Sequence, residues 1–231
     1  MSSFINLSKN VEATIKDTSA DPHPYGYFGF GLTCILFGIC NANFFAVDSM
    51  ILAMALFFGG LCQILGGILC NKKGYFLNGF AFVAWGFFWI SYAIMTILAN
   101  CKVISAPGYV SQAWYLAVWA TMTVFMWINS IYYLELAVQF FYFSVFLWMY
   151  ILAFGYGYAH LNTTIAGGWF GIFCGVLAFY CGSAHIVSFE GKKLIPLGEN
   201  YCCSRKRNQD HQQNHAEEQI KGGLEAPKTG I

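Results

Sequence analysis

The chain consists of long apolar stretches separated by brief polar breaks. Between Asp21 and Glu190 the only charged residues are Asp48, Lys72, Lys73, Lys102 and Glu135. A helix needs about 20 apolar residues to cross roughly 30 Å of hydrocarbon, and every stretch between these charges is long enough for that. The pattern therefore predicts transmembrane helices joined by short loops.

Six helices are expected from this pattern. The first four cover residues 25–47, 49–71, 74–100 and 111–134. The uncharged stretch between Glu135 and Glu190 is too long for one crossing, and the polar segment 160–164 divides it into a fifth and a sixth helix. A membrane β-barrel would require segments of about 10 residues with alternating polarity, and runs such as residues 80–89 do not alternate. The expected fold class is all-α, a polytopic membrane protein with six transmembrane helices.

Composition agrees with a lipid environment and narrows the function. Of the 231 residues, 58% are hydrophobic and 10% are charged, whereas soluble domains carry about 25% charged residues. The apolar stretches hold no Ser/His/Asp set, no metal-ligand cluster and no nucleotide-binding loop. We therefore expect that the protein is not an enzyme, and that it has no catalytic residue, cofactor, metal site or nucleic-acid partner.

The distribution of basic residues predicts the orientation. Residues 1–20 lack the apolar segment of a cleavable signal peptide. With six crossings, one side holds the basic residues of the C-terminal tail together with Lys9, Lys16, Lys72 and Lys73, whereas Lys102 lies on the other side. Basic loops favour the cytoplasm, so both termini are expected there. We expect a multi-pass protein of the plasma membrane.

Three segments are expected along the chain. Residues 1–20 form a cytoplasmic N-terminal segment, residues 21–199 the six-helix transmembrane domain, and residues 200–231 a mobile cytoplasmic tail with little apolar content. Cys202 and Cys203 come shortly before the basic residues 205–207. This pattern is typical of juxtamembrane cysteines that can be palmitoylated, although unmodified cysteines fit it as well.

Glycines recur at helical spacing in the second and sixth expected helices. They are the pairs Gly59-Gly60 and Gly66-Gly67, seven residues apart, and Gly167, Gly171 and Gly175, four residues apart. Stripes of small residues let helix backbones approach closely in lipid. The stripes predict helix packing, either around a narrow path or between subunits.

A few polar residues within the expected helices are candidates for lining a path. Thr33 and Asn41 lie in the first helix and Gln63 in the second. Because a polar side chain facing lipid is costly, these groups should face the interior, as hydrogen-bond partners between helices or as the lining of a wet path. His185 has no carboxylate or second histidine near it in sequence and is interpreted as a structural donor. Charged residues are absent from the helix centres, so no charged proton relay is expected.

The segment DPHPYGYFGFGLT, residues 21–33, resembles the signature that opens the acetate uptake transporter family, Asn-Pro-x-Pro-x-Gly-Leu followed by Gly-Phe-Gly. The motif positions are Asp21, Pro22, Pro24 and Gly26, with Asp21 in place of the asparagine. Similarity continues to residues 194–199 and so covers nearly all of residues 21–199. At the start of a helix Asp21 can also accept hydrogen bonds from orphan backbone amides.

This resemblance implies a six-helix protomer, a homohexamer, and a separate solute path in each protomer. Because the resemblance implies a hexamer, we expect at least one glycine stripe to lie between protomers. The resemblance also implies that the narrowest point of the path lies at Phe30, Trp85 and Val145, the last two replacing a tyrosine and a leucine. The indole of Trp85 offers one N–H donor, which suits a carboxylate.

The expected function is therefore passage of acetate or a similar short monocarboxylate, with succinate as a larger candidate, by a channel-like or proton-coupled mechanism. Two alternatives stay open. An uncharged lining would also suit a channel for ammonia, urea or water. A membrane sensor or scaffold that recruits partners through its cytoplasmic tail is the alternative outside transport.

Overall fold

The computed structural model describes residues 19–191 and 194–199, and within these ranges every regular element is a helix. The elements are α2 (His23–Asn41), α3 (Ser49–Leu56), the π-helix η1 (Phe57–Cys62), α4 (Gln63–Lys72), α5 (Phe76–Asn100), α6 (Tyr109–Tyr133), α7 (Leu136–Gly157) and α8 (Leu161–Phe189). Because α3, η1 and α4 follow one another without a break, the described residues form six helical rods. The expected tail and its Cys202 and Cys203 lie outside the described residues.

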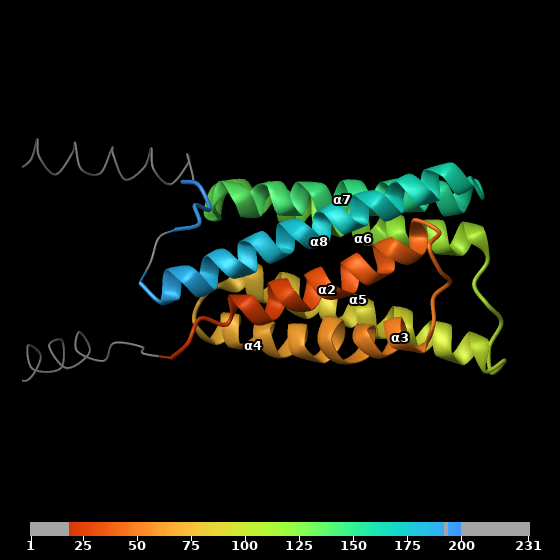
Figure 1. Ribbon diagram of the computed structural model, residues 1–231, viewed down its shortest axis with the longest axis horizontal. Helices are drawn as coiled ribbons and strands as arrows, with labels where there is room; N and C mark the ends of the chain where they lie inside the picture. The colour runs from red at the N-terminus through yellow and green to blue at the C-terminus, as the bar shows by residue number, and fades with distance from the viewer. Residues whose placement is uncertain (1–18, 192–193, 200–231) are drawn as a thin grey trace, which may run out of the picture.

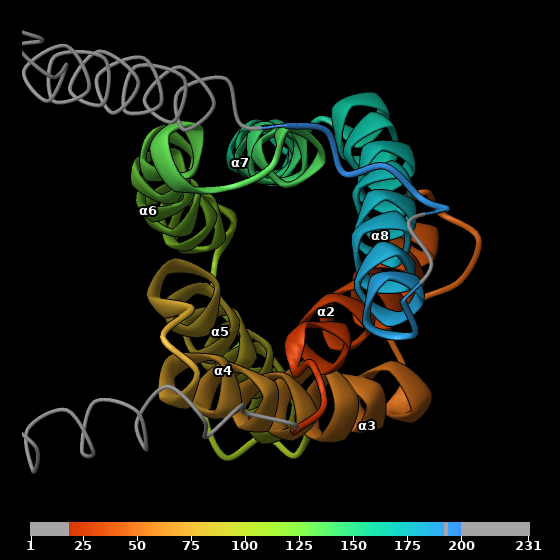
Figure 2. The same ribbon diagram turned by 90° about the vertical axis from the view of Figure 1, so that its left-hand side faces the viewer.

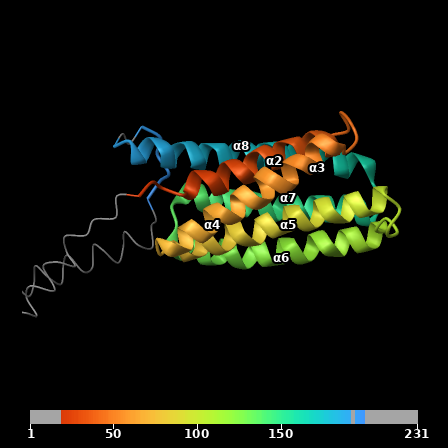
Figure 3. The same cartoon turned by 90° about the horizontal axis from the view of Figure 1, so that it is seen from below.

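The six rods run side by side along the long axis of the molecule (Figures 1 and 3). Seen end-on, they surround a common interior, and α2 lies between α8 and the rod formed by α3 and α4 (Figure 2). The two ends of the described chain, residues 19 and 199, lie at the same end of the bundle (Figure 1). The core between the rods contains many aromatic rings.

Five of the rods are long and apolar enough to cross a membrane: Ser49–Lys72, Phe76–Asn100, Tyr109–Tyr133, Leu136–Gly157 and Leu161–Phe189. The sixth rod, α2, is not among them. It starts with His23 and Pro24 and contains four glycines, which lower its apolar content. The all-helical prediction is therefore confirmed, and so is the presence of several rods suited to a membrane.

Two predicted boundaries are wrong. The first helix ends at Asn41 rather than at residue 47, because Asn43 adopts a left-handed conformation with φ of 68°. The next rod starts as expected, since Asp48 accepts hydrogen bonds from the amides of Met50 and Ile51 at 3.0 and 3.3 Å. The break before the last helix is shorter than expected, and residues 161–164 already belong to the first turn of α8.

The glycine stripes pack within one chain. A Cβ atom added at each of these glycines would collide with a neighbouring helix: Gly59 with Thr33, Gly60 with Ile90, Gly66 with Tyr25, Gly67 with Gly79, Gly167 with Leu152, Gly171 with Trp148 and Gly175 with Ile35. These close approaches support the predicted role of the stripes in helix packing. The space beside each of these glycines is filled by the same chain, and the expected contact of one stripe between protomers stays a prediction.

Candidate functional site

One face of α2 points into the bundle and carries a regular row of buried residues. Buried residues recur along it at alternating spacings of four and three, and they are His23, Tyr27, Phe30, Cys34, Phe37 and Asn41. This spacing places all six side chains on one face of a helix. One face of α2 therefore runs from a titratable residue at its start, past aromatic rings, to a polar amide at its end.

Aromatic rings from α5 and α7 meet this face near its middle. Phe30 makes edge contacts with Trp85 and Trp148, with ring centroids 5.4 and 6.3 Å apart. One turn beyond Cys34, Phe37 makes similar contacts with Trp89 and Trp148 at 5.7 and 6.1 Å. Edge-to-face pairs of this kind hold aromatic rings in defined positions. The middle of the interior is thus a cluster of interlocked rings from three helices.

Two of these indoles carry an unused hydrogen-bond donor. The Nε1 atoms of Trp89 and Trp148 are buried, and neither has an acceptor among the described residues. Leaving a buried donor without a partner costs about 1–3 kcal/mol, and such groups in a native protein call for an explanation such as a water or a bound molecule. Both indole rings contact Phe37, so the two donors belong to one part of the interior.

The structure brings together part of the expected constriction. Phe30 and Trp85 are in edge contact, and Val145 is fully buried in the same hydrophobic cluster. Sequence reasoning missed Trp89 and Trp148. Their spacing could have revealed them, because Trp89 lies one helical turn after Trp85, and Trp148 lies three residues after Val145.

The three expected polar residues are buried but differ in their bonding. Thr33 donates to the carbonyl of Gly29 in its own helix at 2.9 Å. Asn41 donates to the carbonyl of Phe37 at 2.9 Å and accepts a short hydrogen bond from the hydroxyl of Tyr156. These two side chains therefore act mainly as structural partners. Gln63 is 1% exposed, and its Oε1 has no donor among the described residues.

A cluster that the sequence did not predict lies where α2 begins and α8 ends. Asp21 Oδ1 accepts from the backbone amide of His23, the first residue of α2, at 3.1 Å, while the N-cap position itself is Pro22. The same carboxylate lies 2.5 Å from His23 Nδ1 and 2.8 Å from His185 Nδ1. His185 has no carboxylate or second histidine near it along the chain, but the fold brings Asp21 and His23 beside it, and its contact with Asp21 agrees with the interpretation as a structural donor. The pairing joins residues 164 positions apart, which sequence spacing cannot reveal.

The charge state of Asp21 follows from these contacts. Burial of the carboxylate would raise its pKa, but the hydrogen bonds from His185 and His23 outweigh burial and hold the pKa of Asp21 well below its ordinary value of 3.8. Asp21 is consequently ionised at neutral pH. An ionised carboxylate only accepts hydrogen bonds, so both imidazole Nδ1 atoms must donate to it.

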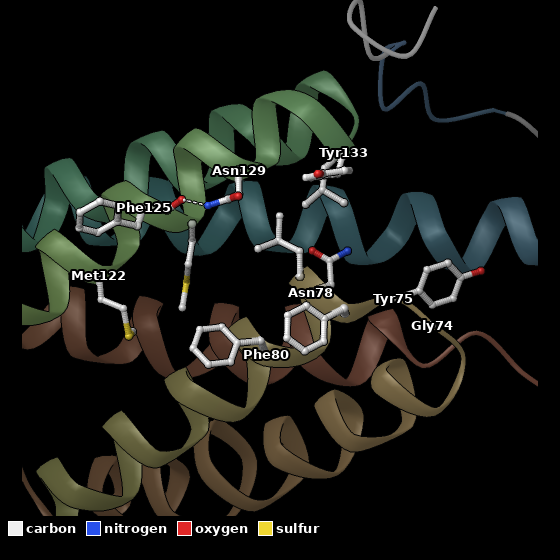
Figure 4. A pocket seen from close by; sticks show the side chains of 12 residues that line it. Gly74, Tyr75, Asn78, Phe80, Met122, Phe125, Asn129 and Tyr133 are labelled. Atoms are coloured by element: carbon white, nitrogen blue, oxygen red, sulfur yellow. Dashed lines mark hydrogen bonds between the residues drawn. The ribbon is translucent and has the colours of Figure 1, made fainter. Parts of the chain in front are cut away.

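Two cavities open at the same end of the bundle. One, of about 710 Å³, lies between the start of α5 and the end of α6 and is lined by Asn78, Phe80, Met122 and Asn129 among others (Figure 4). The other, of about 580 Å³, is lined by Asp21, Tyr25 and Glu190 among others. The second cavity gives the surroundings of the bundle access to the Asp21 cluster. Phe30, Trp85 and Val145 line neither cavity.

Comparisons with known proteins agree with this architecture. The sequence profile described as the GPR1/FUN34/yaaH family matches residues 5–195. The succinate-acetate/proton symporter SatP of Escherichia coli (strain K12) is 32% identical over 183 residues, covering 79% of this chain and 97% of SatP. Ammonia transport outward protein 3 of Saccharomyces cerevisiae is 30% identical over 178 residues, covering 70% of this chain and 62% of its own length.

A solved structure resembles the fold closely. The structure of the bacterial acetate channel SatP superposes with a TM-score of 0.76 at 32% sequence identity. It covers 78% of this chain and all of the solved chain. The helical bundle therefore has a counterpart among proteins of known structure.

Proposed function

This chain belongs to the GPR1/FUN34/yaaH family, and from that premise we propose that it lets acetate or a similar short monocarboxylate cross a membrane through the interior of each protomer. Relatives named for acetate, succinate and ammonia transport support this assignment. The similar solved structure is described as an acetate channel. An integral membrane transporter, rather than an enzyme, is what these relatives and the five membrane-suited rods favour.

The observation that carries the proposal is the pair of unused indole donors. A carboxylate is an acceptor and needs donors to replace its hydration shell. Trp89 and Trp148 present two buried N–H groups in a part of the bundle where no described Asp, Glu, Lys or Arg is buried. Donors without a fixed charge can bind an anion weakly enough to release it, which passage requires.

The width of the path would be set one turn away from these donors. Phe30, Trp85 and Val145 are buried in the same cluster, and Phe30 and Trp85 touch edge to face. In our proposal these three side chains form the size filter. Trp85 fills more of the cross-section than a tyrosine would, which favours acetate over succinate.

The membrane arrangement is part of the same proposal. All six rods, α2 included, cross the bilayer, which makes residues 21–199 one transporter domain. Both described chain ends lie at the end of the bundle that carries Lys72 and Lys73, in agreement with a cytoplasmic location of both termini (Figure 1). The assembled form is a homohexamer in the plasma membrane, with the tail of residues 200–231 in the cytoplasm.

Uptake of labelled acetate into liposomes that contain the purified protein tests this function. Liposomes without protein provide the background, because undissociated acetic acid crosses lipid by itself. The account expects protein-dependent uptake that excess unlabelled acetate inhibits and that succinate inhibits less. Uptake at the background rate at every acetate concentration would refute the proposed function.

A second candidate solute is ammonia, favoured by the 30% identical ammonia transport outward protein. The uncharged aromatic interior would not exclude a small neutral molecule. Labelled methylammonium uptake in the same liposomes separates the two solutes. Acetate transport predicts that methylammonium neither enters through the protein nor competes with acetate, whereas an ammonia path predicts uptake that acetate leaves unchanged.

A further inference from the structure

The cluster of Asp21, His23 and His185 stands at the entrance to the aromatic interior. The His23 and His185 rings stack at a centroid distance of 4.2 Å. The His185 ring also stacks on Tyr27 at 5.6 Å, and Tyr27 contacts Phe141 at 5.7 Å. Phe141 in turn contacts Phe30 at 5.3 Å, so a continuous series of ring contacts joins the cluster to the middle of the path.

The orientation of the two imidazoles favours a shared carboxylate over a shared metal ion. Three ligand atoms of Asp21, His23 and His185 do lie within 4.8 Å of one another. The ring planes, however, are only 12° from parallel. An ion bound along the lone pairs of both rings would have to lie in both planes, and stacked parallel planes share no such point. A carboxylate offers a separate oxygen to each ring, and the contacts at 2.5 and 2.8 Å use both oxygens.

The second ring nitrogen of His185, Nε2, is buried and makes no hydrogen bond to the described residues. The hydroxyl of Tyr27, whose ring stacks on His185, is likewise buried without a partner. With Nδ1 committed to Asp21, a proton that reaches His185 can only bind at Nε2. The protonated ring would then present a charged N–H donor that has no acceptor among residues 19–191 and 194–199.

We propose that the Asp21–His23–His185 cluster loads a proton and a carboxylate together at the mouth of the path. With both imidazoles neutral the cluster carries the single negative charge of Asp21, which repels an anion. One proton on His185 Nε2 makes the cluster neutral and supplies the missing donor for a carboxylate oxygen. This inference rests on the proposed function and identifies where that function would take up its proton.

The subsequent transfer conserves charge and protons. The bound carboxylate oxygen takes the proton from Nε2, so that an O–H bond forms while the N–H bond breaks and the electron pair stays on nitrogen. The cluster returns to a charge of minus one, and the solute becomes a neutral acid. A neutral acid enters an apolar aromatic interior at much lower cost than an anion does, and its carbonyl oxygen can still accept a hydrogen bond from the indole N–H of Trp89 or Trp148.

Other titratable groups surround the cluster, and among the described residues the carboxylate contacts of His23 and His185 are those with Asp21. Asp21 and Glu190 both line the 580 Å³ cavity. A proton can reach Asp21 through this cavity. Three groups lie next to members of the cluster: Cys70 on α4 interacts with Asp21, Tyr75 before α5 contacts His23, and Glu190 after α8 lines the cavity with Asp21. One step further away, Lys73 after α4 interacts with Cys70, while Cys181 on α8, Tyr142 on α7 and Glu135 before α7 interact with Tyr27 on α2. Outside the cluster, the aromatic ring nearest to His23 is that of Tyr75, with the ring centroids 4.7 Å apart.

Nuclear magnetic resonance of the full chain in lipid nanodiscs tests the inference without relying on transport. The protein is labelled with ¹⁵N-histidine, and the His23 and His185 signals are assigned with His23→Gln and His185→Gln. The expected result is that acetate moves the protonation midpoint of His185 to higher pH, because two ligands that bind together must raise each other's affinity equally. Chloride at equal concentration should not do so. An unchanged midpoint with acetate would overturn the proposal.

The same protein in liposomes provides the functional arm. Acetate uptake above the protein-free background should rise about tenfold from pH 7.5 to pH 5.5, the range in which histidine changes charge. His185→Gln should abolish this rise, whereas His160→Gln, at the opposite end of α8, should retain it. If the wild type takes up acetate but His185→Gln keeps the full pH dependence, the loading site is wrong and the proposed function stands. If the wild type takes up none, the proposed function fails, while the midpoint measurement still decides the site.

Discussion

The indole nitrogen of Trp148 on α7 lies against Gly171 on α8, where a Cβ atom would come within 2.6 Å of it. The glycine leaves room for a tryptophan whose donor faces no acceptor among the described residues. Gly171 therefore packs inside the protomer and leaves room for the side chain of Trp148, which we propose lines the path. A side chain at position 171 should therefore displace Trp148 within the same protomer.

Gly171→Ala should destabilise the protein by about 1–3 kcal/mol and reduce acetate uptake, since an overfilled contact pushes a ring of the interior aside. Thermal unfolding in detergent measures the stability, and light scattering measures the assembled mass. Gly108→Ala is the matched control, because the nearest atom to a Cβ there, Ser111 Oγ, is 4.0 Å away. A variant that dissociates into smaller species with unchanged unfolding temperature would instead place Gly171 between protomers.

Trp85→Tyr should broaden the range of transported acids toward succinate, and Trp85→Ala should raise flux while selectivity falls. Both changes remove bulk from the ring that touches Phe30 edge to face. The measurement is the ratio of initial acetate and succinate uptake rates in liposomes. Trp169→Tyr, at a tryptophan that is 55% exposed on α8, controls for general effects of the substitution. An unchanged ratio in both Trp85 variants would place the filter elsewhere.

Asp21→Asn should lower thermal stability at neutral pH, and the difference from wild type should persist down to about pH 4. The pKa of Asp21 lies below its ordinary value of 3.8, so the ionised form stabilises the folded protein above that pH. This contribution is lost only as the pH falls below 3.8 toward the lower pKa of the folded state. Unfolding temperatures of both proteins at pH 4.5, 3.5 and 2.5 test this pH dependence of the stability difference. A difference already absent at pH 4.5 would show that His23 and His185 do not hold the carboxylate in its charged form.

Deletion of residues 204–231 should leave acetate uptake unchanged, because every group assigned to the path lies between Asp21 and His185. The same deletion would abolish the function of a scaffold that recruits partners through its tail. Uptake by the truncated protein, at equal amounts in the liposomes, separates these two functions. Loss of uptake with an intact assembled mass would contradict the account.

Much of the fold could be predicted from the spacing of charges. Residues such as Asp48 and Glu135 lie between apolar stretches because a charge at the centre of a bilayer is costly, so they mark the ends of helices. The end of α2 could not be placed in this way. It depends on the left-handed backbone of Asn43, which lies five residues before the next charged residue, Asp48.

The site was predictable only where it follows one helix. The spacing of Phe30 and Phe37 along α2 places both on one face, and Trp89 follows Trp85 by one turn. The contact between Asp21 and His185 could not be inferred, because it depends on how α2 packs against α8. The burial of Gly171 against Trp148 depends in the same way on the packing of α7 and α8.

Replacement of the two donor tryptophans by phenylalanine tests the central claim most directly. Trp89→Phe together with Trp148→Phe keeps an aromatic ring at each position and removes only the indole N–H groups and part of the bulk. The matched control is Trp114→Phe, at a tryptophan that is 68% exposed. Initial rates of labelled acetate uptake are measured in liposomes across a range of acetate concentrations. The account predicts at least about a tenfold loss of apparent acetate affinity in the double variant, roughly 1.4 kcal/mol, and none in the control; wild-type affinity in the double variant would contradict it.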